Sequence, residues 1–141
     1  MPLLVDTSVW SLALRRDAEG AEPEVQALKD ALQGDEVVVT TGLVLQELLQ
    51  GFSGPKAQAQ IVERFKALPL IQPDRDDHIA AASLRNACRR AGVQIGTIDA
   101  LLAQLCIRNE LTLLTTDKDF VFAAKHCPLR VWPARTRAKK A

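Results

Sequence analysis

The 141-residue sequence lacks any apolar run close to the roughly 18 residues that a membrane-spanning helix requires. Its N-terminus also lacks the basic segment and the small-residue cleavage site of a secretory signal peptide. We therefore expect a soluble protein that stays in the cytoplasm and has no contact with a membrane.

Cysteine is scarce, and its spacing excludes two common frameworks. The three cysteines, Cys88, Cys106 and Cys127, are odd in number and far apart, with no CxxC pair. This spacing predicts neither a disulfide framework nor a zinc site. We interpret all three as unreactive thiols that fill space in the core.

Acidic residues are absent after Asp119, although the net charge of the whole chain is only +1. The last eight residues, ARTRAKKA, carry four basic side chains, so the rest of the chain is mildly acidic. We expect residues 134–141 to form a disordered basic tail. The tail could follow an RNA backbone, but a solvated terminus is the interpretation that we favour.

The length of the chain and the positions of its Gly and Pro residues favour a single domain. A chain of this length, with 48% apolar residues, can bury one sizeable core. The sequence has no internal repeat, low-complexity segment or interior linker, and its Gly and Pro residues fall between the expected elements. The prediction is a single domain over residues 1–133, followed by the tail.

Five short, unbroken apolar runs are typical of strands that are buried on both faces of a sheet. They cover residues 3–5, 37–39, 68–71, 111–114 and 129–132. Helical stretches alternate with these runs, over residues 22–32, 41–51, 55–67, 75–91, 97–109 and 118–126. This alternation predicts an α/β fold in which a parallel sheet lies between α-helices.

An acidic residue follows the first expected strand directly. In parallel α/β sheets the binding crevice lies outside the carboxyl ends of the strands, and Asp6 falls at that place. A carboxylate there is well placed for chemistry. The alternative is that Asp6 caps the helix that follows it.

Two more aspartates are predicted at the same edge. In LTLLTTDKDF a buried strand again ends in polar residues, with Asp117 after the strand and Asp119 two residues later. Asp99 lies in the first turn of the helix expected over residues 97–109, which only one or two residues join to that strand. Helix and strand must run antiparallel, and their similar lengths, about 20 Å and about 17 Å, place Asp99 beside the strand end. Asp99 and Asp117 should therefore converge with Asp6.

Glu47 is a fourth candidate. In TTGLVLQELLQG it falls a turn or two into the helix that follows the second strand. Its neighbours Leu43 and Val44 predict that it lies on an apolar flank, where a carboxylate needs a partner. The alternatives are that Glu47 pairs with an arginine and that Asp99 only complements its own helix dipole.

Four carboxylates at one edge require protons or a cation. Two like charges 4 Å apart repel by about 4 kcal/mol at an effective dielectric constant near 20. Oxygen ligands without histidine or cysteine nearby suit Mg²⁺ or Mn²⁺, which also bind phosphate oxygens. We infer phosphate ester chemistry, in which a metal ion activates water and stabilises the leaving oxygen.

The segments LLVDTSVW, LVLQELLQG, GVQIGTIDALLAQL and LLTTDKDF resemble, in order and spacing, the acidic segments of the PIN-domain ribonucleases. The resemblance covers nearly the whole chain and is closest to the VapC toxins of bacterial and archaeal toxin–antitoxin pairs. It implies that four residues bind metal and are catalytic: Asp6, Glu47, Asp99 and Asp117. It also implies that Ser8 is an accessory hydroxyl near the first acid. Asp117 and Asp119 both remain candidates for the fourth acid, and we favour Asp117 because it follows the strand directly.

The same resemblance implies a fold, a reaction and partners. The fold is a parallel sheet between helices, and the reaction is Mg²⁺-dependent hydrolysis of RNA. The implied partners are a second copy of the chain in a homodimer and an antitoxin whose C-terminal segment silences the enzyme. A housekeeping RNA-processing nuclease or a catalytically silent PIN interaction module would share this fold and stays an alternative.

Two other enzyme or signalling classes fit the sequence less well. A phosphatase of the haloacid dehalogenase type would need a second aspartate where Ser8 stands. A receiver domain would need a paired acid after the first strand and a lysine after the fifth, where Pro133 follows Trp132.

The remaining noticeable residues are interpreted as structural. Asp74 and Asp77 in PDRDDHIAAASLR could suggest a second metal site, but their spacing is typical of a helix N-cap with acidic first-turn residues. His126 has no ligand partner at a useful spacing. Trp10 and Trp132 are interpreted as core or interface residues rather than base-stacking platforms.

Overall fold

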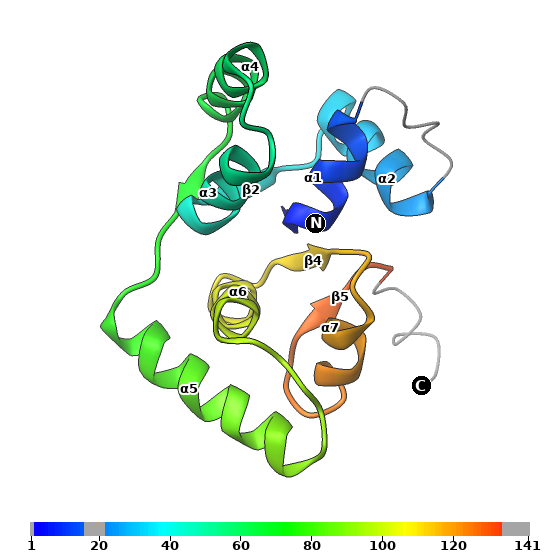
Figure 1. The fold of residues 1–141 in the computed structure, drawn as a ribbon. Helices are drawn as coiled ribbons and strands as arrows, with labels where there is room; N and C mark the ends of the chain where they lie inside the picture. Colours follow the sequence, from blue (N-terminus) through cyan, green and yellow to red (C-terminus); the bar gives the residue numbers. More distant parts are fainter. Residues whose placement is uncertain (1, 16–21, 134–141) are drawn as a thin grey trace.

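Five parallel strands form the centre of the structure, a computed structural model that describes residues 2–15 and 22–133 (Figure 1). In spatial order they are β3 (Leu70–Ile71), β2 (Val38–Thr41), β1 (Leu3–Val5), β4 (Thr112–Leu114) and β5 (Arg130–Val131). All four neighbouring pairs are parallel. The basic tail predicted over residues 134–141 lies outside the described residues.

The three central strands differ from the two edge strands in burial. Every residue of β1, β2 and β4 is buried, whereas β3 and β5 are half-buried or exposed. The expectation of strands buried on both faces is therefore correct for the centre of the sheet and wrong for its edges. Leu3 of β1 pairs with Val38 of β2 on one side and with Thr112 of β4 on the other.

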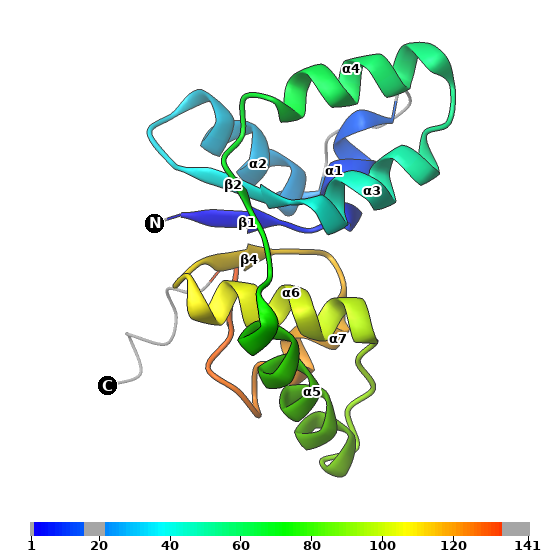
Figure 2. The ribbon, with the colours of Figure 1, turned by 90° about the vertical axis from the view of Figure 1, so that its left-hand side faces the viewer.

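Seven helices of the described residues cover the sheet on both sides. They are α1 (Thr7–Leu14), α2 (Pro23–Gln33), α3 (Gly42–Gly51), α4 (Pro55–Phe65), α5 (Arg75–Arg90), α6 (Thr97–Arg108) and α7 (Lys118–Ala123). Figures 1 and 2 show α1 to α4 together on one side and α5 to α7 on the other. Right-handed crossovers give this division, because the chain moves from β1 to β3 in one direction and returns to β4 and β5 in the other. The predicted α/β architecture is confirmed.

Helix α1 is absent from the six helical stretches that the periodicity predicted. The helix has the sequence TSVWSLAL and is covered by the rest of the protein on most sides. Val9 and Trp10 are buried, and its other residues are half-buried. A helix covered in this way needs no polar stripe, so the pattern on which the prediction relied is missing. The Trp10 ring packs on Phe65 of α4, with ring centroids 4.9 Å apart.

The cysteines and the second tryptophan have the structural positions that were expected. Cys88 and Cys106 are buried, Cys127 is half-buried, and all three are free thiols. Burial raises the pKa of each thiol, that of Cys106 to about 12, which keeps them protonated and unreactive. Trp132 is partly buried against the core. Within the described residues, no helix is long and apolar enough to cross a membrane.

A tight turn joins α6 to β4, as predicted from their spacing. Asn109 is the C-cap of α6, and Glu110 has a φ of 54°, in the left-handed region where helices commonly end. The amide of Leu111 then donates to the carbonyl of Cys106 at 2.8 Å. The chain reverses here, so the first turn of α6 lies near the carboxyl end of β4.

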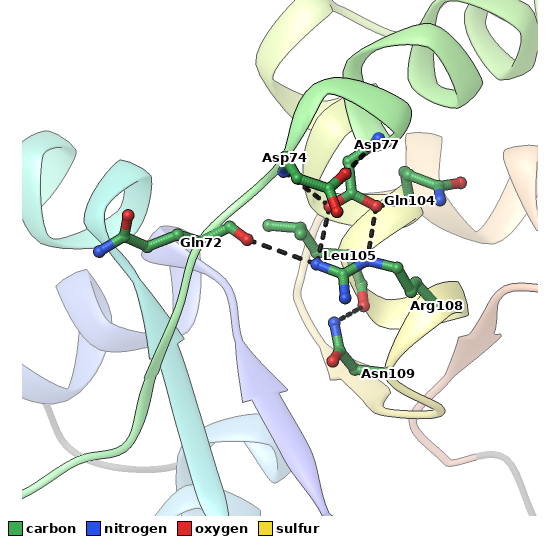
Figure 3. A network of polar contacts seen from close by, with 7 residues as sticks. All are labelled: Gln72, Asp74, Asp77, Gln104, Leu105, Arg108 and Asn109. Carbon is green, nitrogen blue, oxygen red and sulfur yellow. Dashed lines mark hydrogen bonds and ion pairs between the residues drawn. The ribbon is translucent and has the colours of Figure 1, made fainter.

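The capping prediction for α5 is confirmed, and one of its residues has a second role (Figure 3). The amide of Asp77 donates to Asp74 at 2.9 Å, and the amide of Asp74 donates to Asp77 at 3.0 Å. The Asp77 side chain, 0% exposed, also accepts hydrogen bonds from Nε and Nη2 of Arg108, both at 2.7 Å. The Arg108 guanidinium holds the pKa of Asp77 at about 2. These contacts join α5 to α6 and occupy Asp77 as a structural group.

Candidate metal centre

Asp6 lies where β1 ends and α1 begins, but its side chain does not cap the helix. Its amide donates to the Leu114 carbonyl at 2.9 Å, which continues the pairing of β1 with β4. The Asp6 carboxylate makes no capping hydrogen bond to α1. Instead, its Oδ2 atom accepts hydrogen bonds from Ser8 and from Thr115, each at 2.8 Å. Asp6 is therefore the N-cap residue of α1 by position, but the expected capping by its side chain is wrong.

The two hydroxyls that hold Asp6 also bind the loop between β4 and α7. The Thr115 hydroxyl accepts from the amide of Asp117 at 3.0 Å, and the Ser8 hydroxyl accepts from the amide of Thr116 at 3.2 Å. Each hydroxyl thus donates to Asp6 and accepts from this loop. Both hydroxyls donate to Oδ2 of Asp6. Among the hydrogen bonds of the described residues, none is made to its Oδ1 atom.

Thr115 is a site residue to which the sequence reasoning gave no role. Val5 of β1 pairs with Leu114 of β4, so the next residues of the two strands, Asp6 and Thr115, lie side by side. The pairing of β1 with β4 would have identified Thr115 as a neighbour of Asp6. The sequence does not predict the order of the strands, and so it does not predict this pairing.

Asp99 is half-buried in the first turn of α6 and is the most perturbed carboxyl of the group. Its pKa is raised from 3.8 to about 6, and burial is the largest cause. The negative charges of Asp6, Asp117, Glu47 and Asp119, in decreasing order of effect, account for the rest of the rise. Acids from three other segments of the chain are therefore within electrostatic reach of the Asp99 carboxyl group.

Asp117 and Asp119 begin α7. Asp117 is the N-cap, and its Oδ1 atom accepts a hydrogen bond from the amide of Asp119 at 2.9 Å. Asp117 is half-buried, whereas Asp119 is exposed. The charge of Asp117 also has the larger effect on the pKa of Asp99.

Glu47 differs from the expectation of an apolar flank. Helix α3 buries Val44 and Leu48 in the core and leaves Glu47 exposed. Its Oε1 atom accepts a hydrogen bond from the hydroxyl of Thr7, in the first turn of α1, at 2.6 Å. Among the ion pairs of residues 2–15 and 22–133, none joins Glu47 to an arginine. Thr7 is therefore a second contact of the site that the sequence reasoning missed.

The donor set has the chemistry of a site for a hard cation. In the part of the chain that the structure describes, no group of three or more His, Cys, Asp or Glu side chains is arranged to hold a metal ion. The charges that act on Asp99 nevertheless come only from carboxylates, and oxygen donors suit Mg²⁺ and Mn²⁺. A cation among them would relieve the repulsion that raises the pKa of Asp99.

Residues 3–125 match the PIN domain family, and the chain belongs to that family. It is similar to ribonuclease VapC11 of Mycobacterium tuberculosis, with 29% identity over 127 residues that cover 87% of this chain and 92% of the relative. These findings confirm the resemblance inferred from the four acidic segments.

Solved structures of related complexes and toxins share the fold. VapBC2 of Rickettsia felis, bound to a DNA fragment from its promoter, has a TM-score of 0.70 at 21% identity, covering 93% of this chain and 97% of the matched one. Mycobacterium tuberculosis VapC20, a toxin that cleaves the sarcin–ricin loop, has a TM-score of 0.64 at 21% identity, covering 91% and 98%. At these identities the likeness establishes the fold.

Proposed function

We propose that this protein is a metal-dependent endoribonuclease and the toxin of a toxin–antitoxin pair. The observation that carries the proposal is the raised pKa of Asp99, because its causes include acids from all the candidate segments. Strongly perturbed carboxyls beside other carboxyls are typical of active sites. Similarity to a VapC ribonuclease and to a VapBC complex supports the same function.

In this proposal four residues hold Mg²⁺, or Mn²⁺ in its place: Asp6, Glu47, Asp99 and Asp117. When bound, the ion supplies a Lewis acid that lowers the pKa of water and stabilises charge on the phosphate. Asp119 is the accessory acid, and Ser8 and Thr115 are positioning residues that fix the Asp6 carboxylate through Oδ2.

The chain's own residues prepare the site in distinct ways. The hydroxyls of Ser8 and Thr115 leave Oδ1 of Asp6 without a competing donor among the described residues. Thr7 holds Glu47 on the exposed surface of α3 and so orients a side chain that is otherwise mobile in solvent. Asp99 binds a cation only as a carboxylate, so its pKa of about 6 sets the pH above which it is a strong ligand.

Partners follow from the same proposal. The protein acts on RNA in the cytoplasm. It forms a homodimer, and a VapB-like antitoxin inhibits it. Structures of VapBC complexes share this fold, which supports an antitoxin partner.

The test is cleavage of a fluorescent single-stranded RNA by purified variants. We expect Asp6→Asn, Glu47→Gln, Asp99→Asn and Asp117→Asn each to remove nearly all cleavage, because each removes one charged ligand. Asp76→Asn on α5 and Glu63→Gln on α4 are matched controls on exposed residues, and they should cleave like the wild type.

The metal requirement is tested in the same assay. Cleavage should need Mg²⁺ or Mn²⁺ and should stop in EDTA. Undiminished cleavage in EDTA, or full activity in any two of the four acid variants, would contradict the proposed site.

A further inference from the structure

Helix α7 has an exposed face that the proposed catalytic site does not use. Phe120 and Ala123 point into the core, whereas Val121 and Phe122 are 45% and 46% exposed. Two large apolar side chains therefore lie next to each other at the surface of a six-residue helix. The chain enters α7 from the carboxyl end of β4 (Figure 1). Asp117 is the N-cap of this helix and Asp119 lies in its first turn, so the exposed face lies next to these two acids.

Two lysines flank the exposed aromatic ring. Lys118 lies four residues before Phe122, a spacing that puts both side chains on the same side of a helix. The Lys125 ammonium lies 5.6 Å from the centre of the Phe122 ring, within the range of a cation–π contact. The face therefore presents an aromatic ring between two exposed positive charges.

The charges on and near this face indicate what kind of molecule binds to it. A cluster of carboxylates repels phosphates, so an RNA strand that reaches Asp99 needs positive charge along its path. Lys118 supplies such charge at the cluster, and Lys125 supplies it farther along. No acidic residue follows Asp119 in the sequence, so the chain beyond α7 adds no repulsion of its own.

We propose that the exposed face of α7, formed by Lys118, Phe122 and Lys125, binds single-stranded RNA next to the acidic cluster. Phe122 stacks on one unpaired base, and the two lysines contact the phosphates on either side of it. Stacking on an aromatic ring needs an unstacked base, so the face selects single strands over duplexes. This inference rests on the proposed ribonuclease function and names the form of substrate that the site takes.

The binding test uses the full-length protein in EDTA, where cleavage is not expected, and a fluorescein-labelled 12-nucleotide single-stranded RNA followed by anisotropy. Phe122→Ala should weaken binding at least about fivefold, the lower end of the loss expected for one base stack. Phe122→Leu should weaken it similarly, and Phe122→Trp should retain it, because Leu keeps the apolar volume without the ring. Ile79→Ala, on the exposed surface of α5, is the control.

The lysines are tested by salt dependence. Each lost phosphate contact should reduce the slope of log affinity against log salt by about 0.7 for a single strand. We expect this reduction for Lys125→Gln and no change for Lys29→Gln, a matched exposed lysine on α2. A duplex of the same sequence should bind more weakly than the single strand and should not respond to Phe122→Ala.

Cleavage kinetics separate this inference from the proposed function. If the wild type cleaves RNA with Mg²⁺, Phe122→Ala should raise KM with little change in kcat, because it removes binding and no catalytic group. Wild-type cleavage with unchanged Kd, salt slope and KM in both variants would overturn the RNA-binding face alone. A change in oligomeric state or in antitoxin binding, without a change in RNA affinity, would overturn it in favour of a protein interface. Absence of both RNA binding and cleavage in the wild type would overturn both proposals.

Discussion

In the proposed metal site, Asp99 is the residue at which a proton and a metal ion would compete most directly. Its pKa of about 6 lies well above the 3.8 of an ordinary aspartate, through burial first and the neighbouring charges second. A carboxyl group with this pKa changes its charge near pH 6, within the pH range of ordinary protein buffers. In the proposed function, its protonation state therefore links the stability of the protein to its metal affinity and activity.

We predict that the metal-free protein loses stability as pH rises from about 4 to 6. The folded state holds the Asp99 proton up to pH about 6, whereas the unfolded chain releases it near 3.8, so the folded state binds more protons across this window. The stabilisation is complete below 3.8 and absent above 6. Asp77 has a folded pKa of about 2, so its own effect on stability falls mainly below pH 3.8, outside this window.

Thermal unfolding in EDTA at pH 5 and at pH 7.5 measures this effect. The wild type should have the higher Tm at pH 5, and Asp99→Asn should remove most of the difference. At pH 7.5 the Asp99→Asn variant should melt above the wild type, because it lacks the repelled charge. Mg²⁺ should then stabilise the wild type more than the variant. An equal pH response in both proteins would mean that Asp99 is not the titrating group.

A second prediction at this scale concerns Thr115. Thr115→Val keeps the shape of the side chain but removes the donor to Asp6 and the acceptor for the amide of Asp117. Loss of such a supporting hydrogen bond typically weakens metal binding by about 10- to 100-fold. The measurement is the Mg²⁺ concentration that gives half-maximal RNA cleavage.

Two variants make the Thr115 result specific. Thr115→Ser retains the hydroxyl and should keep the wild-type Mg²⁺ requirement, whereas Thr115→Val should raise it. Thr40→Val, at a fully buried threonine of β2, should leave it unchanged. An equal Mg²⁺ requirement in all four proteins would show that Thr115 has only a packing role.

The site could be predicted from the sequence to the extent that it depends on strand ends. Asp6 and Asp117 follow buried strands, and the short connection from α6 to β4 brings Asp99 to them. The contacts of Thr7 and Thr115 could not be predicted, because a hydroxyl's partner is known only after the elements are paired. Glu47 was selected for a burial that it does not have, although its charge does act on Asp99.

At the scale of elements, one ion pair joins the start of α5 to the end of α6. Asp77 accepts two hydrogen bonds from Arg108 and a weaker one from Gln104 at 3.3 Å, while Arg108 also donates to the carbonyl of Gln72 at 3.4 Å. Asp77 is fully buried, so its charge depends on these partners. The contact holds α5 against the helix that carries Asp99.

We predict that Asp77→Asn lowers the Tm at neutral pH by several degrees and leaves the cleavage rate of the folded protein nearly unchanged. The folded pKa of Asp77 is depressed to about 2, so its stabilisation is present above pH 3.8 and is lost as pH falls toward 2. The Tm difference between wild type and variant should shrink over that window. Asp74→Asn, which keeps a capping side chain, is the milder comparison. Loss of cleavage in folded Asp77→Asn protein would assign this residue to the catalytic machinery.

Element boundaries depart from the sequence prediction where burial is incomplete. The apolar runs over residues 68–71 and 129–132 are longer than β3 and β5, because only two residues of each pair with a neighbouring strand. Helix α7 was expected to reach residue 126 but ends at Ala123, with Ala124 as its C-cap. Leu129 is buried whereas Pro69 is exposed, so an apolar run at the edge of a sheet does not mark where the strand begins or ends.

At the scale of the whole molecule, the sheet order explains why these acids meet. The chain moves from β1 to one edge and then returns to β4 on the other side of β1, so the carboxyl ends of these two strands, where ligands bind in sheets of this kind, lie side by side. Asp6 leaves β1, and Asp117 follows β4, at that point. The sequence predicted a parallel sheet, but not its order, because apolar runs do not encode which strand lies next to which.

The last prediction is that the protein is toxic when made alone and harmless when made with its antitoxin. The proposed cluster of carboxylates with a hard cation acts on phosphodiesters in general, so an unrestrained enzyme would cut cellular RNA. An arginine of the partner can pair bidentately with the acids and take the place of the cation, while an amphipathic helix covers apolar surface beside them. Inhibition of this kind requires the carboxylates of the proposed cluster, which the wild type retains.

The test follows growth and total RNA integrity after induction of the wild type, Asp6→Asn and the exposed control Asp76→Asn at matched expression. The wild type and Asp76→Asn should arrest growth and degrade RNA, because both retain the acidic cluster, whereas Asp6→Asn should do neither. Coexpression of a small upstream protein with a DNA-binding N-terminus should restore growth to both toxic forms. Normal growth with all three, from folded protein that cleaves RNA in vitro, would favour a housekeeping nuclease. Normal growth from folded protein that cleaves nothing would favour a catalytically silent interaction module.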